Sequence, residues 1–348
     1  MTTTMTTPAN TGETGQAPAA RAGDPRLPMI LLGCGAFLAV LGLLVRLHVY
    51  PSGLGHPVDP DEVVRLRATG ASYFDLAGLR QVRGADIEVV TALRGNPGPA
   101  PDRAVWTEIT STLAGDRSRI GYRERRVAVD RFTGMAVNCC GEYVDNDRNA
   151  RQAGLSFRWP FGAARRDYPF YDPELRQAAP MRFDGVETVR GVRVHRYTQR
   201  IEPTLVEELR DPLPGAAVGM PGRARVALQR WYSVDRTYWV EPSGGLPVAV
   251  REAQRQTLRT ADGTERAVLF QADLRTDEND VEALTARAAR FVTWSRWMSV
   301  IIPAGLGGAG MVTALAGLYL LRRTRSRFQV SSSRSPGTDT TEAAQRGW

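Results

Sequence analysis

Two long apolar runs, one near each end of the chain, most constrain what this sequence can fold into. Residues 27–45 form 19 consecutive uncharged positions, and residues 298–321 form 24. As a helix that rises about 1.5 Å per residue, each run is long enough to cross a hydrocarbon core of roughly 30 Å. Core helices of soluble proteins seldom continue so far without a charge. We therefore predict transmembrane helices over 27–46 and 298–321.

A cleaved signal peptide is the main alternative for the first run. The apolar region of such a peptide is about 7 to 15 residues long, and no small-x-small cleavage pattern follows this run. Leu31-Leu32-Gly33-Cys34 faintly resembles a lipoprotein cleavage box, but 11 more apolar residues follow Cys34. We expect Cys34 to be an ordinary small residue inside a first span.

Arginines next to the second run predict how the chain is oriented. The sequence contains no lysine, and its arginines are mixed with acids except for a cluster directly after Leu321 that begins with Arg322 and Arg323. Positive residues beside a span favour the cytoplasmic side. With two spans, both termini are expected in the cytoplasm and residues 47–297 outside the cell membrane. The mixed charge elsewhere predicts no nucleic-acid partner.

The remaining parts of the chain differ in composition. Residues 1–26 and 322–348 are rich in small and polar residues without periodicity, and we expect both to be disordered tails. In the central part, residues 105–113 alternate between apolar and polar side chains, which is typical of a strand. Turn signals at Pro242-Ser243-Gly244-Gly245, at Val189-Arg190-Gly191-Val192 and at Asp262-Gly263 predict hairpins, the last of type I′. The fold class predicted is a β-rich (α+β) antiparallel ectodomain between two terminal transmembrane helices.

Two helices are expected to flank this β-rich domain. Asp59-Pro60-Asp61-Glu62 combines a cap, a proline and an acid in the spacing of a helix start, so a short helix is predicted to about Ala68, ending near Gly70. After Thr276 the apolar spacing becomes helical and continues into the second run. Trp294 and Trp297 are then placed as anchors at one membrane interface, and Arg322 and Arg323 at the other.

The sequence lacks the usual patterns of catalytic chemistry. Its three histidines form no zinc-binding pattern with cysteines and carboxylates, and no G-x-S-x-G, P-loop or dinucleotide fingerprint occurs. His195 alternates with Val194 and Tyr197 in an expected strand, which favours a structural role. We predict no catalytic residue, no metal and no cofactor.

Cys139 and Cys140 are the two cysteines of the predicted ectodomain. An oxidising exterior favours disulfides, yet adjacent Cα atoms lie about 3.8 Å apart, below the roughly 4.4 to 6.8 Å typical of disulfides. Three states stay open, which we rank as free thiols, a vicinal disulfide and an intermolecular bridge.

Aromatic residues and prolines are dense over residues 157–173. Proline there favours an irregular, extended path over a central strand. One interpretation is a loop packed over a sheet; the other is an apolar wall that receives a lipid chain. The ligand-binding candidates are Trp159, Phe161, Tyr168, Phe170 and Tyr171.

Small residues recur at helical spacing in both apolar runs and predict close pairing of the two spans. They are Gly35, Ala39 and Gly42 in the first run and Gly305, Ala309, Thr313 and Gly317 in the second.

Four motifs carry a resemblance to a known family. Together they resemble the actinobacterial porin PorA family of two-span envelope proteins, over about residues 28–321. The resemblance implies a role in envelope lipid or lipoglycan metabolism and brings no catalytic residues. The family name implies a pore, but two helical spans disagree with an outer-membrane barrel. The motifs are Arg131-Phe132-Thr133-Gly134, Trp159-Pro160-Phe161-Gly162, Tyr168-Pro169-Phe170-Tyr171-Asp172-Pro173 and Thr237-Tyr238-Trp239-Val240-Glu241-Pro242.

Three functional hypotheses follow. The first is a membrane-anchored protein whose ectodomain binds or transfers an envelope lipid or lipid-linked glycan, by analogy also with the topology of class B scavenger receptors. The second is a scaffold for other envelope proteins that binds no small ligand. The third, disfavoured by the missing motifs, is an envelope hydrolase or transferase. An apolar cavity inside the domain separates the first hypothesis from the second.

Overall fold

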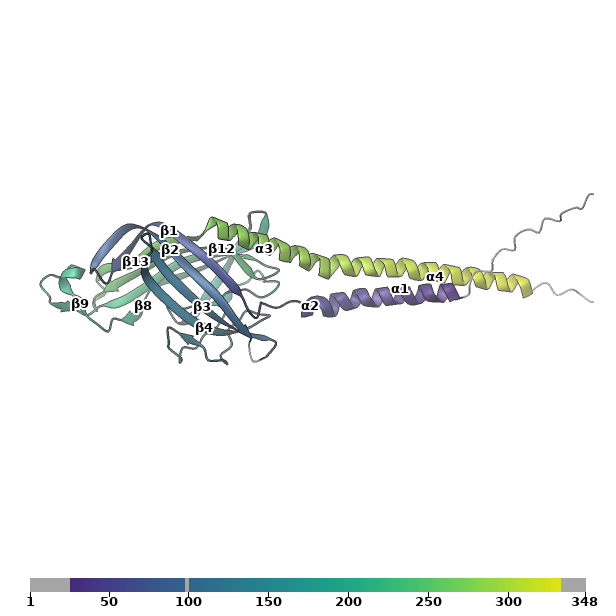
Figure 1. Ribbon diagram of the computed structural model, residues 1–348, viewed down its shortest axis with the longest axis horizontal. Helices are drawn as coiled ribbons and strands as arrows, with labels where there is room; N and C mark the ends of the chain where they lie inside the picture. The colour runs from purple at the N-terminus through teal and green to yellow at the C-terminus, as the bar shows by residue number, and fades with distance from the viewer. Residues whose placement is uncertain (1–25, 98–99, 333–348) are drawn as a thin grey trace, which may run out of the picture. The chain divides into compact units, whose positions relative to one another are not determined.

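A computed structural model describes residues 26–97 and 100–332 of the chain (Figure 1). These residues fall into two units, of which one is Arg46–Val300 and the other contains the long apolar helices near the two termini. Of the tails expected over 1–26 and 322–348, residues 1–25 and 333–348 lie outside the described part. Residues 322–332 continue the last helix.

One antiparallel sheet of eleven strands makes up most of the unit Arg46–Val300. Its strand order is β5-β4-β3-β2-β1-β13-β12-β11-β8-β7-β6, while β9 (Leu213–Pro214) and β10 (Arg225–Val226) pair separately around a short 3-10 helix, Gly215–Val218. The β-rich antiparallel expectation is confirmed. The strands are β1 Asp61–Asp75, β2 Arg80–Pro97, β3 Arg103–Ala114, β4 Arg119–Asp130, β5 Tyr143–Val144, β6 Tyr168–Asp172, β7 Gln177–Val189, β8 Val192–Glu208, β11 Gln229–Glu241, β12 Leu246–Arg259 and β13 Glu265–Thr276.

The sheet curls into a half-barrel, and every second residue of its central strands points to the concave face. On β1 the inward residues are Glu62, Val64 and Leu66, and on β12 they include Glu252 and Gln254. This period of two follows from the pleat, because successive side chains of a strand point to opposite faces. The concave face therefore collects side chains from strands that are far apart in the sequence. Figure 1 shows how these strands curl together.

The two edges of the half-barrel are joined where β4 ends. Val129 of β4 forms an isolated bridge with Ala136, Met135 forms one with Leu155, and Leu155 forms one with Phe170 of β6. The backbone N–H of Leu155 donates to the carbonyl of Pro169 at 2.7 Å. Two short irregular segments thus connect strands at opposite edges of the sheet and satisfy part of their backbone hydrogen bonding.

The prediction of a short helix from Asp61 to Ala68 is wrong, because these residues belong to β1. The local preference for a helix start is outweighed by strand pairing, because β1 lies between β2 and β13 and hydrogen-bonds to both. Gly70, expected to end the helix, instead adopts a φ of +70° where the register of β1 against β2 shifts. Gly70 therefore marks a β-bulge in the strand, where a glycine of positive φ is common, and not the end of a helix.

The expected hairpins at 189–192, 242–245 and 262–263 are present. The last one is not of type I′, because its loop covers residues 260–264 and only Gly263 has a positive φ there. The helix expected after Thr276 is α3, Glu278–Arg296, whose N-cap Asp277 accepts a hydrogen bond from the N–H of Asn279 at 3.0 Å. Leu284 and Ala288 of α3 pack on a cluster that includes Val194 of β8 and Val248 of β12, two strands that α3 contacts.

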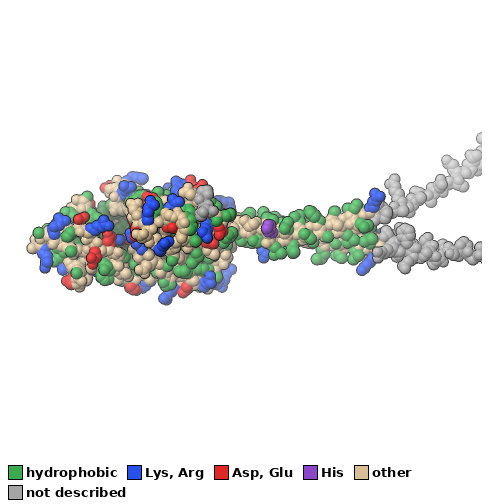
Figure 2. Space-filling model, turned by 90° about the horizontal axis from the view of Figure 1, so that it is seen from below, with side chains coloured by type: hydrophobic (Ala, Val, Ile, Leu, Met, Phe, Trp, Pro, Cys, Tyr) green, Lys and Arg blue, Asp and Glu red, His purple; other side chains and the backbone are tan. Residues whose placement is uncertain are grey.

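Within residues 26–97 and 100–332, two helices are long and apolar enough to cross a membrane. The first comprises α1 (Arg26–Leu44), a π-helical turn (Val45–Val49) and α2 (Tyr50–Ser52); the second contains α3, a π-helical turn (Trp297–Ile301) and α4 (Ile302–Ser332). In the most apolar stretch of 18 residues in each helix, only 17% and 11% of the residues are buried within the structure. Core helices of a soluble domain would be mostly buried, so the two are candidate membrane spans, and Figure 2 shows their largely apolar surface.

The backbones of α1 and α4 approach closely at glycines. A Cβ placed on Gly35 would lie 2.7 Å from the carbonyl oxygen of Gly310, and one placed on Gly310 would lie 2.7 Å from that of Gly35. Gly42 and Gly317 also face the other helix, whereas a Cβ on Gly305 would meet no described atom within 4 Å. Close approach at small residues is typical of helices that pair in membranes.

Candidate functional site

A cavity of about 540 Å³ lies inside the curled sheet. Ligand cavities in proteins commonly measure about 300 to 1,000 Å³, so this volume is sufficient for a sizeable organic ligand. The part of its wall formed by β1, β2 and β13 is largely apolar. That wall includes Val64, Leu66, Val89, Leu93, Phe270 and Leu274.

The opposite part of the wall is polar and is built around Arg236 of β11. Its guanidinium lies 2.9 Å from the carboxylate of Asp172 and 3.3 Å from that of Glu252, and it donates to Gln199 at 3.0 Å. The Tyr232 hydroxyl also donates to Asp172, at 2.9 Å. Burial opposes the charge of Arg236, but its neighbours Tyr232, Glu252 and Asp172 hold its pKa well above the ordinary value. This arginine therefore stays charged.

The other arginines of the wall are also paired with carboxylates. Arg125 of β4 pairs with Glu108 of β3, and Arg158 pairs with Glu62 of β1. Glu174, just after the edge strand β6, pairs with Arg123 of β4 and with Arg230 of β11. Its pair with Arg123 also links the two edges of the half-barrel. The polar wall is thus close to charge-balanced rather than strongly cationic.

The five aromatic residues predicted as ligand contacts are divided between the cavity wall and the protein core. Phe170 and Tyr171 line the cavity from β6. Trp159 is fully buried behind them, with ring centroids 5.5 Å from Phe170 and 5.2 Å from Tyr197.

The remaining two predicted contacts pack elsewhere. Tyr168 lies edge-on against Tyr197, and Phe161 stacks on His56 at 4.7 Å. The prediction that all five contact a ligand stays a prediction, and the geometry places only Phe170 and Tyr171 at the cavity.

Sequence reasoning did not identify the polar wall. The signal for it was the period of two in strands whose inward positions are polar, such as Glu108, Thr110 and Thr112 of β3. In the sequence of an amphipathic strand, polar residues at every second position are normally assigned to the face that is exposed to solvent. Only the curvature of the sheet shows that they point into an enclosed space.

A model of the Porin PorA family matches residues 27–319. The chain belongs to the Porin PorA family. Porin PorA of Corynebacterium amycolatum is 25% identical over 230 residues, which cover 55% of each chain, so the match spans about half the length of that relative. Porin PorA of Corynebacterium resistens is 23% identical over 308 residues, covering 66% of this chain and 74% of the relative.

A solved structure of a Bacteroides fragilis protein with a YmcC-like fold matches at 8% identity. It covers 65% of this chain and 99% of its own, but its TM-score of 0.21 is too low to support an argument about the fold. Membership of the Porin PorA family bears out the resemblance seen in the four motifs and the expectation of a non-enzymatic protein. Together with the two apolar helices, it supports a membrane or envelope location.

The convex face of this Porin PorA domain is charged. Residues that alternate with the cavity-lining positions form exposed ion pairs, such as Arg251 with Asp273 at 2.8 Å and Arg67 with Glu88 at 3.1 Å. Figure 2 shows arginine and acidic side chains interspersed over the surface of the β-rich unit. A membrane barrel instead presents an apolar band to lipid, so this sheet is not suited to face the bilayer.

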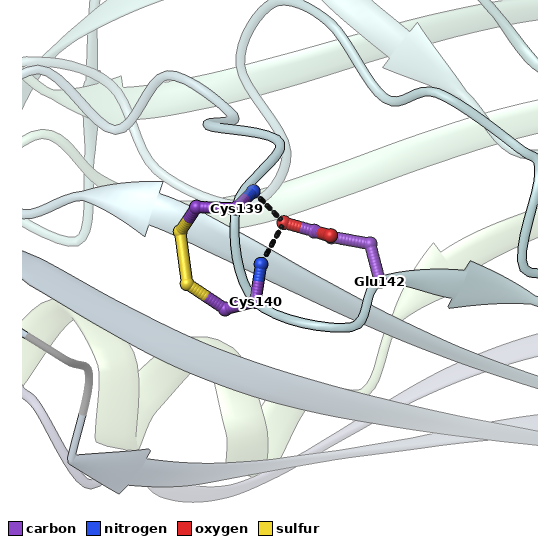
Figure 3. Close-up of a disulfide and its surroundings, with 3 residues drawn as sticks. All are labelled: Cys139, Cys140 and Glu142. Atoms are coloured by element: carbon purple, nitrogen blue, oxygen red, sulfur yellow. Dashed lines mark hydrogen bonds between the residues drawn. A yellow bond between two sulfur atoms is a disulfide. The ribbon is translucent and has the colours of Figure 1, made fainter.

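Cys139 and Cys140 of the Porin PorA chain are joined by a vicinal disulfide (Figure 3). The structure thus contains the second of the three ranked states and not the first, free thiols. The Glu142 carboxylate accepts hydrogen bonds from the backbone N–H groups of Cys139 and Cys140, at 2.5 and 2.9 Å.

The environment of Glu142 keeps its carboxyl ionised. Burial raises its pKa, but hydrogen bonds from backbone N–H groups, including those of the two cysteines, outweigh burial and hold the pKa below the ordinary value. The two sulfurs and this carboxylate are close enough to surround an ion. While the sulfurs are bonded to each other, they are not thiolate ligands.

The predicted membrane anchors occupy different environments. Trp294 of α3 packs on the ring of Tyr50 at 6.0 Å, and the neighbouring Ser295 hydrogen-bonds to the Tyr50 hydroxyl at 2.8 Å. Trp297 is exposed in the π-helical turn that follows α3. Arg322 and Arg323 lie in the C-terminal part of α4, which continues to Ser332. Their role at a membrane interface stays a prediction.

Proposed function

We propose that the β-rich domain binds an envelope lipid or lipid-linked glycan and shelters its apolar part inside the half-barrel, either holding it or passing it on. The cavity of about 540 Å³ with one apolar wall carries this proposal. Burial of apolar surface contributes about 25 cal/mol per Å², so an acyl chain can be held there without a metal or covalent chemistry.

Two further observations favour a binding domain over a pore formed by this sheet. The concave face combines an apolar wall with a charge-balanced polar wall, which suits an amphiphile. The convex face bears exposed ion pairs such as Arg255 with Glu265, which would be costly to place against lipid.

We further propose that the two apolar helices anchor the domain in the cell membrane with both termini in the cytoplasm. The arginines after Leu321 support this orientation, because positive residues beside a span are retained on the cytoplasmic side. The β-rich domain is then extracytoplasmic, beside a supply of lipid ligand.

The proposal is tested by filling the cavity. Gln254 and Ala253 are neighbours on β12 but point to opposite faces, because Gln254 lines the cavity and Ala253 is exposed. In Gln254→Trp, added bulk should displace ligand, whereas Ala253→Trp serves as the matched control. The full chain is purified in detergent micelles from a corynebacterial host, and bound lipids are identified by native mass spectrometry.

We expect a stoichiometric lipid on the unmodified chain and on Ala253→Trp, and its loss from Gln254→Trp. Retention of the same lipid by all three proteins would place it outside the cavity. No bound lipid on any of them, together with no saturable uptake of acyl probes, would contradict the proposal and favour the scaffold hypothesis.

A further inference from the structure

Five buried hydrogen-bond donors in the cavity wall have no hydrogen-bond partner among the described residues. Two of them, Nε of Arg123 and Nε of Arg236, still lie in ion pairs with carboxylates. The other three have no ion pair within the described part of the chain either. They are Nη1 of Arg125, the hydroxyl of Ser156 and the hydroxyl of Tyr171, whose residues are 3%, 2% and 0% exposed. All three residues line the cavity. The great majority of buried polar groups in proteins are paired, so three unpaired donors at one cavity require an explanation.

These donors meet where the edges of the half-barrel are joined. Arg125 comes from β4 and Tyr171 from β6, while Ser156 directly follows Leu155, which bridges to β6. Nη2 of Arg125 donates to the carbonyl of Ser156 at 3.3 Å, and the N–H of Tyr171 donates to the carbonyl of Leu155 at 2.8 Å. The junction itself therefore brings the three side chains together.

The guanidinium of Arg125 is held in place while one of its nitrogens remains available. Its Nε pairs with Glu108, and its Nη2 donates to the carbonyl of Ser156. Its Cζ lies 4.3 Å from the ring centroid of Phe157 and 5.7 Å from that of Tyr171. A donor fixed in this way is preorganised for an acceptor, since little side-chain freedom is lost on binding.

The Tyr171 hydroxyl is a neutral donor at physiological pH. Burial raises its pKa above the ordinary value. No acceptor within the described residues uses its proton, and the aromatic ring is fixed by β6 and by the neighbouring arginine.

We propose that Arg125, Ser156 and Tyr171 form a subsite that binds the acyl carbonyl oxygens of the cavity ligand. This inference rests on the proposed function, because it assigns the polar end of the same ligand. Glu108 already balances the charge of Arg125, so the subsite takes the neutral ester of an acyl lipid as well as the carboxylate of a free fatty acid. The apolar wall formed by β1, β2 and β13 takes the chain.

The test uses the full chain in lipid nanodiscs and three photoreactive probes of equal chain length. One is a fatty acid, one is its methyl ester and one is the corresponding hydrocarbon without carbonyl oxygens. Saturable crosslinking to peptides that line the cavity is measured by mass spectrometry for the unmodified chain, Tyr171→Phe and Ser156→Ala. Tyr197→Phe is the matched control, because its hydroxyl is satisfied by the carbonyl of Ala164 at 2.8 Å and does not line the cavity.

We expect the acid and the ester to bind more tightly than the hydrocarbon. Loss of one donor in Tyr171→Phe or Ser156→Ala should weaken the binding of the acid and of the ester by roughly threefold to tenfold each. The affinity for the hydrocarbon should be unchanged. Thermal stability without probe should be unchanged or higher in Tyr171→Phe, which removes an unpaired group, and lower in Tyr197→Phe, which breaks a hydrogen bond.

The outcomes separate this inference from the proposed function. If all three probes crosslink at the cavity with equal affinity, and the variants do not change these affinities, the subsite is refuted while lipid binding stands. If both variants bind only the ester, or only the acid, more weakly, the subsite is supported. Its natural ligand then belongs to the class of that probe. If no probe crosslinks at the cavity, both proposals are refuted.

Discussion

Replacement of Asp172 is expected to destabilise the β-rich domain more than a change at almost any surface acid. Its carboxylate is fully buried and accepts four hydrogen bonds or ion pairs, from Tyr232, Arg236 and the backbone N–H groups of Glu174 and Leu175. Asp172→Ala leaves Arg236 with a buried charge that is only partly compensated. Breaking such a pair costs about 3 to 5 kcal/mol, which for a domain of this size corresponds to a fall in Tm of roughly 6 to 20 °C.

The assay is thermal unfolding of the full chain in detergent micelles, followed by tryptophan fluorescence. Asp235→Ala, on β11 beside Arg236, is the control, because Asp235 is exposed and lies 4.0 Å from Arg200. A surface pair of this kind contributes about 0 to 1 kcal/mol. Asp172→Asn should fall between the two, since an amide oxygen still accepts from the backbone. If the Tm of Asp172→Ala is as high as that of Asp235→Ala, the buried ion pair contributes no more stability than the exposed one, and the prediction is wrong.

Three further predictions concern topology, redox state and pH. Reporter fusions at both termini should be cytoplasmic and one near residue 215 external; an external C-terminal reporter would overturn the orientation. Cys139 and Cys140 should resist alkylation until reduced and form no dimer on non-reducing gels; a dimer lost in the double serine variant would contradict this. Burial, with Arg158 nearby, lowers the pKa of His56 to about 3. Because the unfolded chain binds that proton near pH 6.5, His56 alone should lower the free energy of unfolding as pH drops from about 6.5 to 3, by up to about 1.4 kcal/mol per pH unit. His56→Phe should make the pH dependence of stability shallower over that range.

The features that sequence analysis predicted are those with local causes. The spans follow from the length of uncharged runs, and the hairpins follow from turn residues such as Gly191 and Gly245, both of which have a positive φ. The N-cap of α3 at Asp277 is equally local. In each case a few neighbouring residues decide the conformation, so no knowledge of distant parts of the chain is required.

The features that were missed depend on contacts between distant residues. Asp61 begins a strand rather than a helix because β2 and β13 pair with it from both sides. The junction at Leu155 links strands β4 and β6 through irregular chain, so no periodicity indicates it. The predicted stripe of small residues includes Gly305 and not Gly310, but the packing of α1 on α4 places Gly310 and not Gly305 at the contact.

The candidate site was anticipated only in part for the same reason. Aromatic density correctly drew attention to the segment that contains Phe170 and Tyr171, which line the cavity. Trp159 looks equivalent in sequence, yet it packs behind the wall because β8 and β11 place Tyr197 and Tyr238 against its ring. Which aromatic side chain faces the cavity and which fills the core is decided by the curvature of the sheet.

A crystal structure of the full chain, purified with its native lipids from a corynebacterial host, would show directly whether a lipid occupies the half-barrel. We expect elongated electron density inside the half-barrel, with the acyl chain along Leu66 and Phe270 and the polar end beside Arg125 and Tyr171. A cavity that holds only ordered water, or that is filled by the protein's own side chains, would contradict this expectation.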